Sequence, residues 1–301
     1  MYVSFTSAKV VEFPDPRAFE RRAGRWLTFR EAENFYLLCV LPSINRALDP
    51  NIRLFTIEDS ETILAAGILL SGGTLSMTWA TPELIDTLVD HAARHHWQIT
   101  SVSGPAHVST LLAKSYADRV GRSIEFHRAE RLFQLANDDY PSPAEGRLEI
   151  VHSAELPLAR AWFEQFALEA QLEMDQPGIH GAVQALVDSR RLYFWKAPHP
   201  VAMAAWVTSS PNGACLNYVY VPAEHRGQGH GKSVSAALAG QMFATGARYC
   251  FMLTDVNDAR ANHLYQSIGA RTLCEILQCR IVSRSSVARP LKNPISPVSP
   301  K

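Results

Sequence analysis

The strongest chemical signal in the sequence is a short segment in which glycines alternate with polar residues, Arg226-Gly-Gln-Gly-His-Gly231, followed by Lys232. The run before it, Leu216-Asn-Tyr-Val-Tyr-Val221, is β-branched and aromatic and predicts a strand. From Gly231 onward, apolar residues recur at four-residue intervals, which predicts a helix. The first N–H groups of a helix have no intrahelical partner, and that end of the helix dipole is positive. A glycine loop that leads into such an end is expected to bind phosphate.

Spacing separates the kinds of phosphate loop that use this design. A Walker A loop requires a glycine five residues before the Gly231-Lys-Ser233 end, and that position is Arg226. A dinucleotide-binding GxGxxG pattern fails from either starting glycine, because lysine or valine stands where its last glycine is required. The pattern that remains is RxxGxG, which Arg226, Gly229 and Gly231 fill.

This RxxGxG pattern resembles the pyrophosphate-binding motif of the GNAT superfamily of N-acetyltransferases. Downstream, the apolar run Tyr249-Cys-Phe-Met-Leu-Thr254 predicts a strand buried on both faces. It leads into residues 256–269, which look like the second GNAT motif, with an asparagine, an Arg-Ala pair, a Leu-Tyr pair and a glycine that ends the helix. One departure is Ala270, where family members usually carry an aromatic residue.

The resemblance covers about residues 148–281 well. The segment Val219-Tyr-Val-Pro-Ala-Glu-His-Arg-Gly227 and the Thr254-Asp255 step look like a bacterial group of tandem GNAT proteins with a degenerate first copy. The first half of the chain resembles that degenerate copy only weakly.

The resemblance implies acetyl-CoA as co-substrate and no metal. In GNAT proteins the strand before the loop splays from its neighbour, and acetyl-CoA lies between the two strands. A backbone N–H directed at the thioester oxygen stabilises the oxyanion that forms when the amine attacks. The implied CoA-binding residues are the strand backbone of Val219, Tyr220 and Val221, the pyrophosphate loop of Arg226, Gly227, Gln228, Gly229, His230, Gly231 and Lys232, and the side chains of Asn257 and Asn262. The alternatives are a plain core strand, a flexible surface loop and a helix N-cap at Asn257.

Tyr265 is the implied catalytic acid. A phenol has a pKa of about 10 and a thiol about 8.5, so a neutral tyrosine held close can donate a hydrogen bond or a proton to the departing CoA thiolate. Ala261, Leu264, Tyr265 and Ile268 share one helical face, which also fits a tyrosine that only packs in the core. Both interpretations of Tyr265 stay open at this point.

The sequence gives less information on the residues that would bind and deprotonate the amine acceptor. An alkylammonium with a pKa of about 10.4 must lose a proton before it attacks, so a base or a water relay is expected. Glu169, Glu173 and Asp175 lie between two predicted helices, and Glu224 and His225 lie beside the glycine loop. Surface carboxylates are usually only solvated, and no base is assigned.

The two halves of the chain resemble each other. Three segments of the first half, 53–57, 64–67 and 75–79, are echoed in order by 191–195, 203–206 and 216–220. In register, such echoes indicate a tandem repeat. We therefore expect the α/β (α+β) class, with two GNAT-like domains, each a mixed, mostly antiparallel sheet flanked by helices with a splayed central strand pair. The expected bounds are 1–140 for a copy without the pyrophosphate loop and 147–282 for the catalytic copy, joined by the Pro- and Gly-containing segment 137–146, with a disordered tail over 283–301.

Composition excludes several classes of function. Lys plus Arg equal Asp plus Glu at 29 each, so no basic excess favours nucleic acid or an anionic membrane. No apolar stretch approaches the ~18 to 20 residues of a membrane span, and the first residues lack the layout of a signal peptide. The five cysteines form no CxxC pair, which favours buried thiols in a reducing cytoplasm over a metal site.

The sequence thus predicts a cytoplasmic enzyme, a monomer or homodimer, that transfers an acetyl group from acetyl-CoA to a primary amine of a small molecule or protein. An acyl-CoA sensor or assembly module without catalysis is one alternative, and a transferase with another acyl donor is a second.

Overall fold

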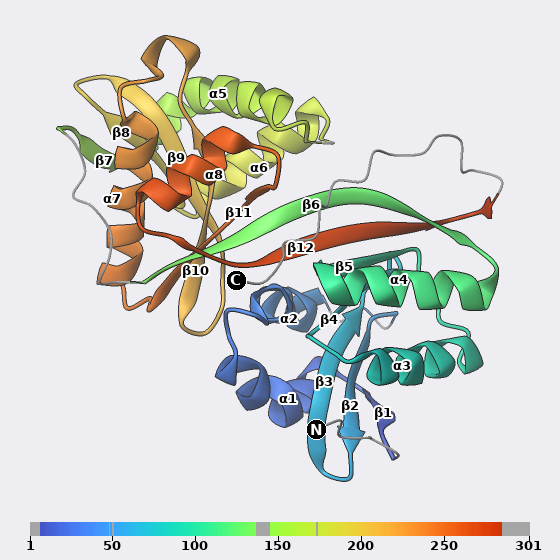
Figure 1. Ribbon diagram of the computed structural model, residues 1–301. Coiled ribbons are helices and arrows are strands. Elements are labelled where there is room, and N and C mark those ends of the chain that lie inside the picture. Colours follow the sequence, from blue (N-terminus) through green and yellow to red (C-terminus); the bar gives the residue numbers. More distant parts are fainter. Residues whose placement is uncertain (1–6, 48, 50, 137–144, 173, 285–301) are drawn as a thin grey trace, which may run out of the picture. The chain divides into compact units, whose positions relative to one another are not determined.

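The computed structural model describes residues 7–47, 49, 51–136, 145–172 and 174–284. The chain forms two compact units, each described here by itself (Figure 1). The first unit comprises the chain up to Ala129 together with the residues from Glu275 onward, and the second comprises Glu130–Cys274. Most of the expected linker and nearly all of the expected disordered tail lie outside the described residues.

The first half of the chain forms a strand, two helices, three strands, a helix, a strand, a helix and a last strand. In order these are β1 (Lys9–Phe13), α1 (Pro16–Phe29), α2 (Phe35–Ala47), β2 (Arg53–Asp59), β3 (Thr62–Leu69), β4 (Thr74–Met77), α3 (Pro82–Arg94), β5 (Ser101–Pro105), α4 (Ala106–Val120) and β6 (Ser123–Ala136).

The second half repeats this order of elements. It runs through β7 (Arg147–Ile150), α5 (Leu156–Glu169), α6 (Gln176–Asp188), β8 (Leu192–Lys196), β9 (Pro200–Ser209), β10 (Gly213–Tyr220), α7 (His230–Ala244), β11 (Tyr249–Asp255), α8 (Ala259–Ser267) and β12 (Arg271–Val282), with short 3₁₀ turns at Ser153–Glu155 and Ala223–His225. The echoed segments fall on corresponding strands, β2 with β8, β3 with β9 and β4 with β10. The predicted tandem repeat is therefore present in the order of the elements.

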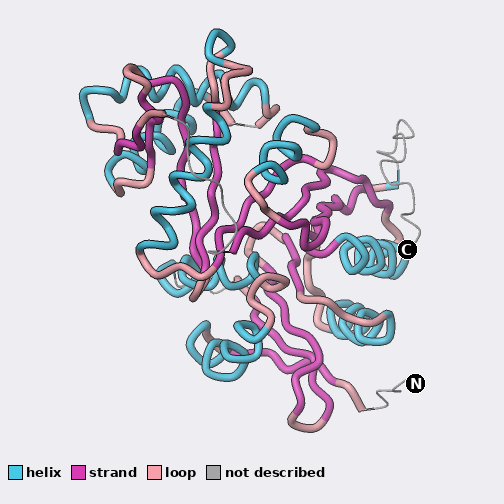
Figure 2. The backbone as a smooth tube through the Cα atoms, turned by 60° about the vertical axis from the view of Figure 1, so that its left-hand side comes forward, coloured by secondary structure: helices cyan, strands magenta, loops and turns pink. Residues whose placement is uncertain are grey.

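Each unit is a sheet with helices on both faces (Figure 2). Strand residues alternate between the two faces, as the period of a strand requires. In the second unit, Phe194 and Met203 point toward α5 and α6, whereas Tyr193 and Ala204 point toward α7 and α8. The first unit divides in the same way, with α1 and α2 on one face and α3 and α4 on the other. The mixed, helix-flanked sheet predicted for both copies is confirmed.

The last strand of each half completes the sheet of the other unit. The strand order is β1-β2-β3-β4-β5-β12 in the first unit and β6-β11-β10-β9-β8-β7 in the second. In the first unit, Ile276–Arg280 of β12 pair antiparallel with β5. In the second unit, residues 130–136 of β6 pair antiparallel with β11. The chain therefore passes from one compact unit to the other at residues 129/130 and again at 274/275. The sequence predicted one such passage, at the linker near residue 140.

The two copies differ where their central strands lead into a helix. In the first unit, β4 reaches α3 through residues 78–81 alone. In the second unit, β10 reaches α7 through residues 221–229, which contain the glycine-rich segment. This loop difference, predicted from the sequence, gives the second unit the stretch of backbone that a phosphate site requires.

Candidate active site

The central strand pair of the second unit is splayed. β10 and β11 run parallel and pair only from Gly213 to Leu216 on β10. Beyond that point β10 stays bonded to β9, with a bulge between Asn217 and Tyr220. Inside the bulge, Tyr218 has a φ of 55°, in the left-handed region that a tyrosine rarely occupies. Because of the bulge and the missing pairing, the backbone at the end of β10 forms no ladder with β11.

The loop after β10 turns on its glycines. Gly227 has a φ of 75° and Gly229 a φ of 81°, and a Cβ added at either would have no heavy atom within 4 Å. The backbone conformation thus favours glycine at both positions, while the space beside them is open. Gly229 is also the N-cap residue of α7, so the loop ends where the helix begins.

Backbone N–H groups at this helix start are unpaired. The first bond of α7 is from the N–H of Ser233 to the carbonyl of Gly229, at 3.0 Å. Among the described residues, the N–H groups of residues 227–232 have no hydrogen-bond partner. Together with the positive end of the helix dipole, they form an anion-binding surface.

A cavity of about 290 Å³ lies between the end of β10, the glycine loop, α8 and the end of α5. Its lining residues are Phe166, Glu169, Ala170, Val219, Tyr220, Val221, His225, Arg226, Gly227, Gly229, His230, Gly231, Asp258, Arg260, Ala261 and Leu264. The structure thus brings together eight of the residues predicted to bind CoA, Val219, Tyr220, Val221, Arg226, Gly227, Gly229, His230 and Gly231. Gln228 and Lys232 are exposed and do not line it.

Arg226 is held in place by the surrounding protein. Its Nε donates to the carbonyl of Val221 at 2.8 Å, and its guanidinium donates to Oε1 of Glu169 at 2.6 Å. The bond to Glu169 raises the pKa of Arg226 above its usual value. Arg260 lies 3.8 Å from the other oxygen of Glu169. One carboxylate therefore contacts two cations at the cavity wall.

The two histidines at the loop are close to each other. The rings of His225 and His230 lie 6.4 Å apart, and both side chains line the cavity. Burial, followed by the charge of His225, lowers the pKa of His230, so its imidazole is neutral near pH 7. Its Nδ1 is buried and has no partner among the described residues.

Tyr265 lies in the core beneath the site rather than in the cavity wall. It is buried, and its ring packs 5.7 Å from that of Phe133. Its neighbours on α8, Ala261 and Leu264, line the cavity. Burial raises the pKa of Tyr265 far above its usual value, so the hydroxyl stays protonated.

The two asparagines have different surroundings. Asn262 is buried; its amide donates to the carbonyls of Asp255 at 2.9 Å and Asp258 at 2.7 Å, and its oxygen accepts from Arg131 at 2.7 Å. These bonds hold the turn between β11 and α8. Asn257 is exposed and is not the N-cap of α8, since the carboxylate of Asp258 accepts from the first N–H groups of that helix.

The candidate acceptor residues are scattered. Glu169 and His225 line the cavity, Glu224 is exposed outside it, and Glu173 lies outside the described residues. Asp175 caps α6 by accepting from the N–H of Gly178 at 2.9 Å. In this structure Asp175 thus serves as the N-cap of α6.

Several cavity residues escaped the sequence analysis. Phe166 and Ala170 carry no motif signal, because their place in the wall depends on how α5 packs, and Asp258 and Arg260 lie in the second GNAT-like motif but were given no role there. Tyr218 gave a misleading signal, since tyrosine favours regular strands and the run Leu216–Val221 around it is β-branched and aromatic.

No helix in the described part of the chain combines the length and apolar character that a membrane span requires. The five cysteines, all among the described residues, form no disulfide; Cys215, Cys250 and Cys279 are buried, whereas Cys39 and Cys274 are only partly covered.

The comparisons with known proteins agree with the fold. Residues 194–280 match the family model described as FR47-like protein. An acetyltransferase of the GNAT family from Colwellia psychrerythraea superposes with a TM-score of 0.58 at 13% identity, over 91% of this chain and 100% of that one. A GCN5-related N-acetyltransferase from Sphaerobacter thermophilus gives 0.54 at 13% identity, over 91% and 96%.

A Drosophila protein is similar to the same extent, with a TM-score of 0.60 at 13% identity over 91% of this chain and 98% of that one. No curated protein matches this chain in sequence. The resemblance to the GNAT superfamily drawn from the sequence is thus confirmed in the fold: the chain has the GNAT fold, and its residues 194–280 match the FR47-like model.

Proposed function

We propose that the second unit binds acetyl-CoA and transfers the acetyl group to a primary amine of a small molecule or a protein. The observation that carries the proposal is the loop before α7, where unpaired N–H groups and Arg226 face a cavity that continues to the splayed end of β10. Pyrophosphate fits the cationic, N–H-rich end of this cavity, and the strand end offers backbone groups to the pantetheine arm. The FR47-like match over the same residues supports the assignment.

In the proposed reaction the neutral amine attacks the thioester carbonyl carbon, and the C–S bond breaks as the C–N bond forms. A backbone N–H at the end of β10, from the segment Val219–Val221, stabilises the oxyanion. The proton of the amine leaves to water or to a base that we do not assign. The CoA sulfur leaves as a thiolate beside α8, whose Ala261 and Leu264 line the cavity and whose Tyr265 lies beneath it.

The raised pKa of Tyr265 refines its proposed role. A phenol with a pKa above 10 is a weaker acid than a thiol of about 8.5, so full proton transfer to a solvated thiolate is unfavourable. A hydrogen bond from the buried hydroxyl stabilises the developing thiolate without the free-energy cost of moving the proton. We therefore propose Tyr265 as a hydrogen-bond donor to the leaving sulfur.

Replacement of Gly229 tests the binding site directly. Gly229→Ala adds backbone strain at a φ of 81°, while Gly229→Asp adds the same strain and a negative charge in the open space where the pyrophosphate would lie. We expect CoA affinity, measured by calorimetry, to fall about tenfold or more for Gly229→Asp and much less for Gly229→Ala.

Gly121→Asp is the matched control, because Gly121 has a φ of 69° and open space beside it but lies in the first unit. It is expected to bind CoA like the wild type. Unchanged affinity in Gly229→Asp would refute the CoA site.

Turnover distinguishes an enzyme from a sensor. Acetyl-CoA is incubated with the wild type and a broad panel of amines, and thiol release and product mass are recorded. Binding of CoA without turnover would favour the sensor or assembly module, and turnover only with a longer acyl-CoA would favour another donor.

A further inference from the structure

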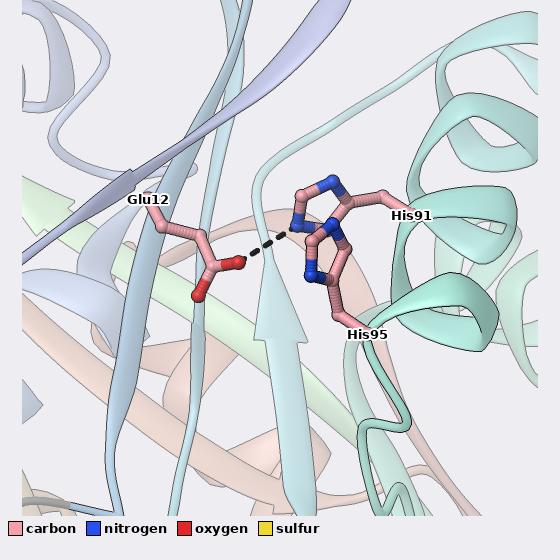
Figure 3. Close-up of side chains that lie close together, drawn as sticks. All are labelled: Glu12, His91 and His95. Atoms are coloured by element: carbon pink, nitrogen blue, oxygen red, sulfur yellow. Dashed lines mark hydrogen bonds and ion pairs between the residues drawn. The ribbon is translucent and has the colours of Figure 1, made fainter.

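A cluster of ligand-bearing side chains lies in the first unit, which has no glycine loop. Glu12 of β1 points toward His91 of α3 and toward His95, the C-cap residue of that helix (Figure 3). Glu12 Oε1 lies 2.8 Å from His91 Nε2, and the two imidazole rings are 4.2 Å apart. One ligand atom from each of the three residues lies within 4.8 Å of the others.

The local structure explains why the three side chains meet. His91 lies in the last turn of α3 and His95 is the C-cap residue four positions later, so the two side chains project to the same side at the end of the helix. β1 runs antiparallel to β2 with Glu12 opposite Phe55, and this register turns the carboxylate toward α3.

Neighbouring side chains orient two of the three ligands. The second carboxylate oxygen of Glu12 accepts from Arg53 at 3.1 Å, which leaves Oε1 directed at the histidines. The ring of Trp97 packs edge-on against His91 at 5.4 Å. The His91 side chain is only 14% exposed and that of Glu12 31% exposed. Such outer contacts are typical of residues that hold a metal ion.

We propose that Glu12, His91 and His95 bind a zinc ion. Two imidazole nitrogens and one carboxylate oxygen form a ligand set that Zn²⁺ accepts in tetrahedral sites, with water as the fourth ligand. Atoms bound to one Zn²⁺ at about 2.0 Å lie roughly 3.3 Å apart, so the widest pair in the cluster, which is no more than 4.8 Å apart, has to close by about 1.5 Å at most. His95 is exposed, and a change of its side-chain rotamer supplies this movement.

The bound ion would connect β1 to α3. The contact it replaces is a single hydrogen bond between Glu12 and His91 beside an ion pair that is partly open to water. A shared metal ligand set is far stronger than an exposed ion pair. Zinc is therefore expected to stabilise the first unit against heat.

The test is a zinc titration of the full, untagged chain after treatment with a chelator, followed by calorimetry and thermal melting. The wild type is expected to bind one Zn²⁺ at this cluster with a rise in Tm. His95→Ala is expected to lose at least tenfold in affinity while keeping the Glu12–His91 bond, so it should fold like the wild type. Glu12→Gln removes the charged ligand with little change in shape and should lose a similar factor.

His107→Ala is the matched control, because His107 is an exposed histidine on α4 outside the cluster. It should bind zinc like the wild type. Equal affinity in the wild type and His95→Ala, or an equal loss in His107→Ala, would overturn the proposal. Since neither readout uses acetyl transfer, the result is independent of the function proposed for the second unit.

Discussion

At the scale of single residues, the carboxylate of Glu169 competes with an anionic ligand for the cations of the cavity. The guanidinium that would bind pyrophosphate, that of Arg226, already donates to Glu169, and Arg260 lies near the same carboxylate. An anionic ligand therefore has to share these cations with Glu169. The carboxylate orients Arg226, but it also lowers the positive potential of the cavity.

Glu169→Gln is expected to tighten CoA binding about two- to fivefold, the range that follows from removing one exposed charge interaction. The amide can still accept from Arg226, so the orientation of the guanidinium is retained. Calorimetry at low and moderate salt measures the effect, which should shrink as salt screens the charge. Glu164→Gln, on the same helix but paired with His180, is the control and should bind CoA like the wild type.

Tyr265→Phe keeps the ring packed on Phe133 and removes only the hydroxyl. If the hydroxyl hydrogen-bonds the leaving sulfur, kcat should fall about 100-fold with little change in Kd for CoA. An unchanged kcat would mean that Tyr265 is only a core aromatic.

The pH dependence of kcat supplies a second check on Tyr265. Tyrosine donates its hydrogen bond in the neutral form, which exists below its pKa, and burial raises that pKa above 10. No loss of wild-type activity from ionisation of Tyr265 is therefore expected up to pH 10. The ratio of wild-type to Tyr265→Phe rates should stay constant from pH 6 to pH 10, and a ratio that falls within this range would contradict the raised pKa.

At the scale of elements, the turn between β11 and α8 depends on Asn262. Its buried amide bonds two backbone carbonyls and its oxygen bonds Arg131, so the side chain is already occupied within the protein. The bond to CoA predicted from the sequence would have to break this network.

Asn262→Ala leaves the two carbonyls and Arg131 without that partner, and it is expected to cost about 2 kcal/mol of stability in urea unfolding. CoA affinity of the folded protein should change little. A large loss of affinity with unchanged stability would instead support a direct contact with CoA.

Local patterns predicted the elements that depend on nearby residues. The glycine loop, the helix after it and the end of α8 at Gly269, with a φ of 92°, follow from spacing and from the backbone freedom of glycine. The bulge at Tyr218 could not be predicted, because the splay of β10 from β11 imposes a positive φ against the preference of the residue. Glu169 beside Arg226 depends on how α5 meets the loop, which no short-range pattern encodes.

At the scale of the whole molecule, the exchange of β6 and β12 decides what a stable fragment contains. Phe133 and Leu135 of β6 are fully buried in the core of the second unit. Residues 147–301 lack this strand, which leaves β11 with an open edge and the core with a gap.

Expressed alone, residues 147–301 are therefore expected to be insoluble or unfolded. Residues 123–274 retain β6 and omit the part of β12 that pairs with β5, so this fragment should be soluble and bind CoA. Circular dichroism and calorimetry on the two fragments check the prediction. A folded 147–301 fragment with full CoA affinity would show that β6 is dispensable.

The exchange of β6 and β12 also determines when the first unit can finish folding during synthesis. β5 leaves the ribosome early, but its partner β12 is made only after α8. Until then the edge of β5 has no partner, and Val102, buried in the finished protein, lacks part of its cover. The first unit thus cannot complete its sheet until Ile276–Arg280 of β12 have been made, and a chain released before that point would expose an unpaired strand edge that is prone to aggregate.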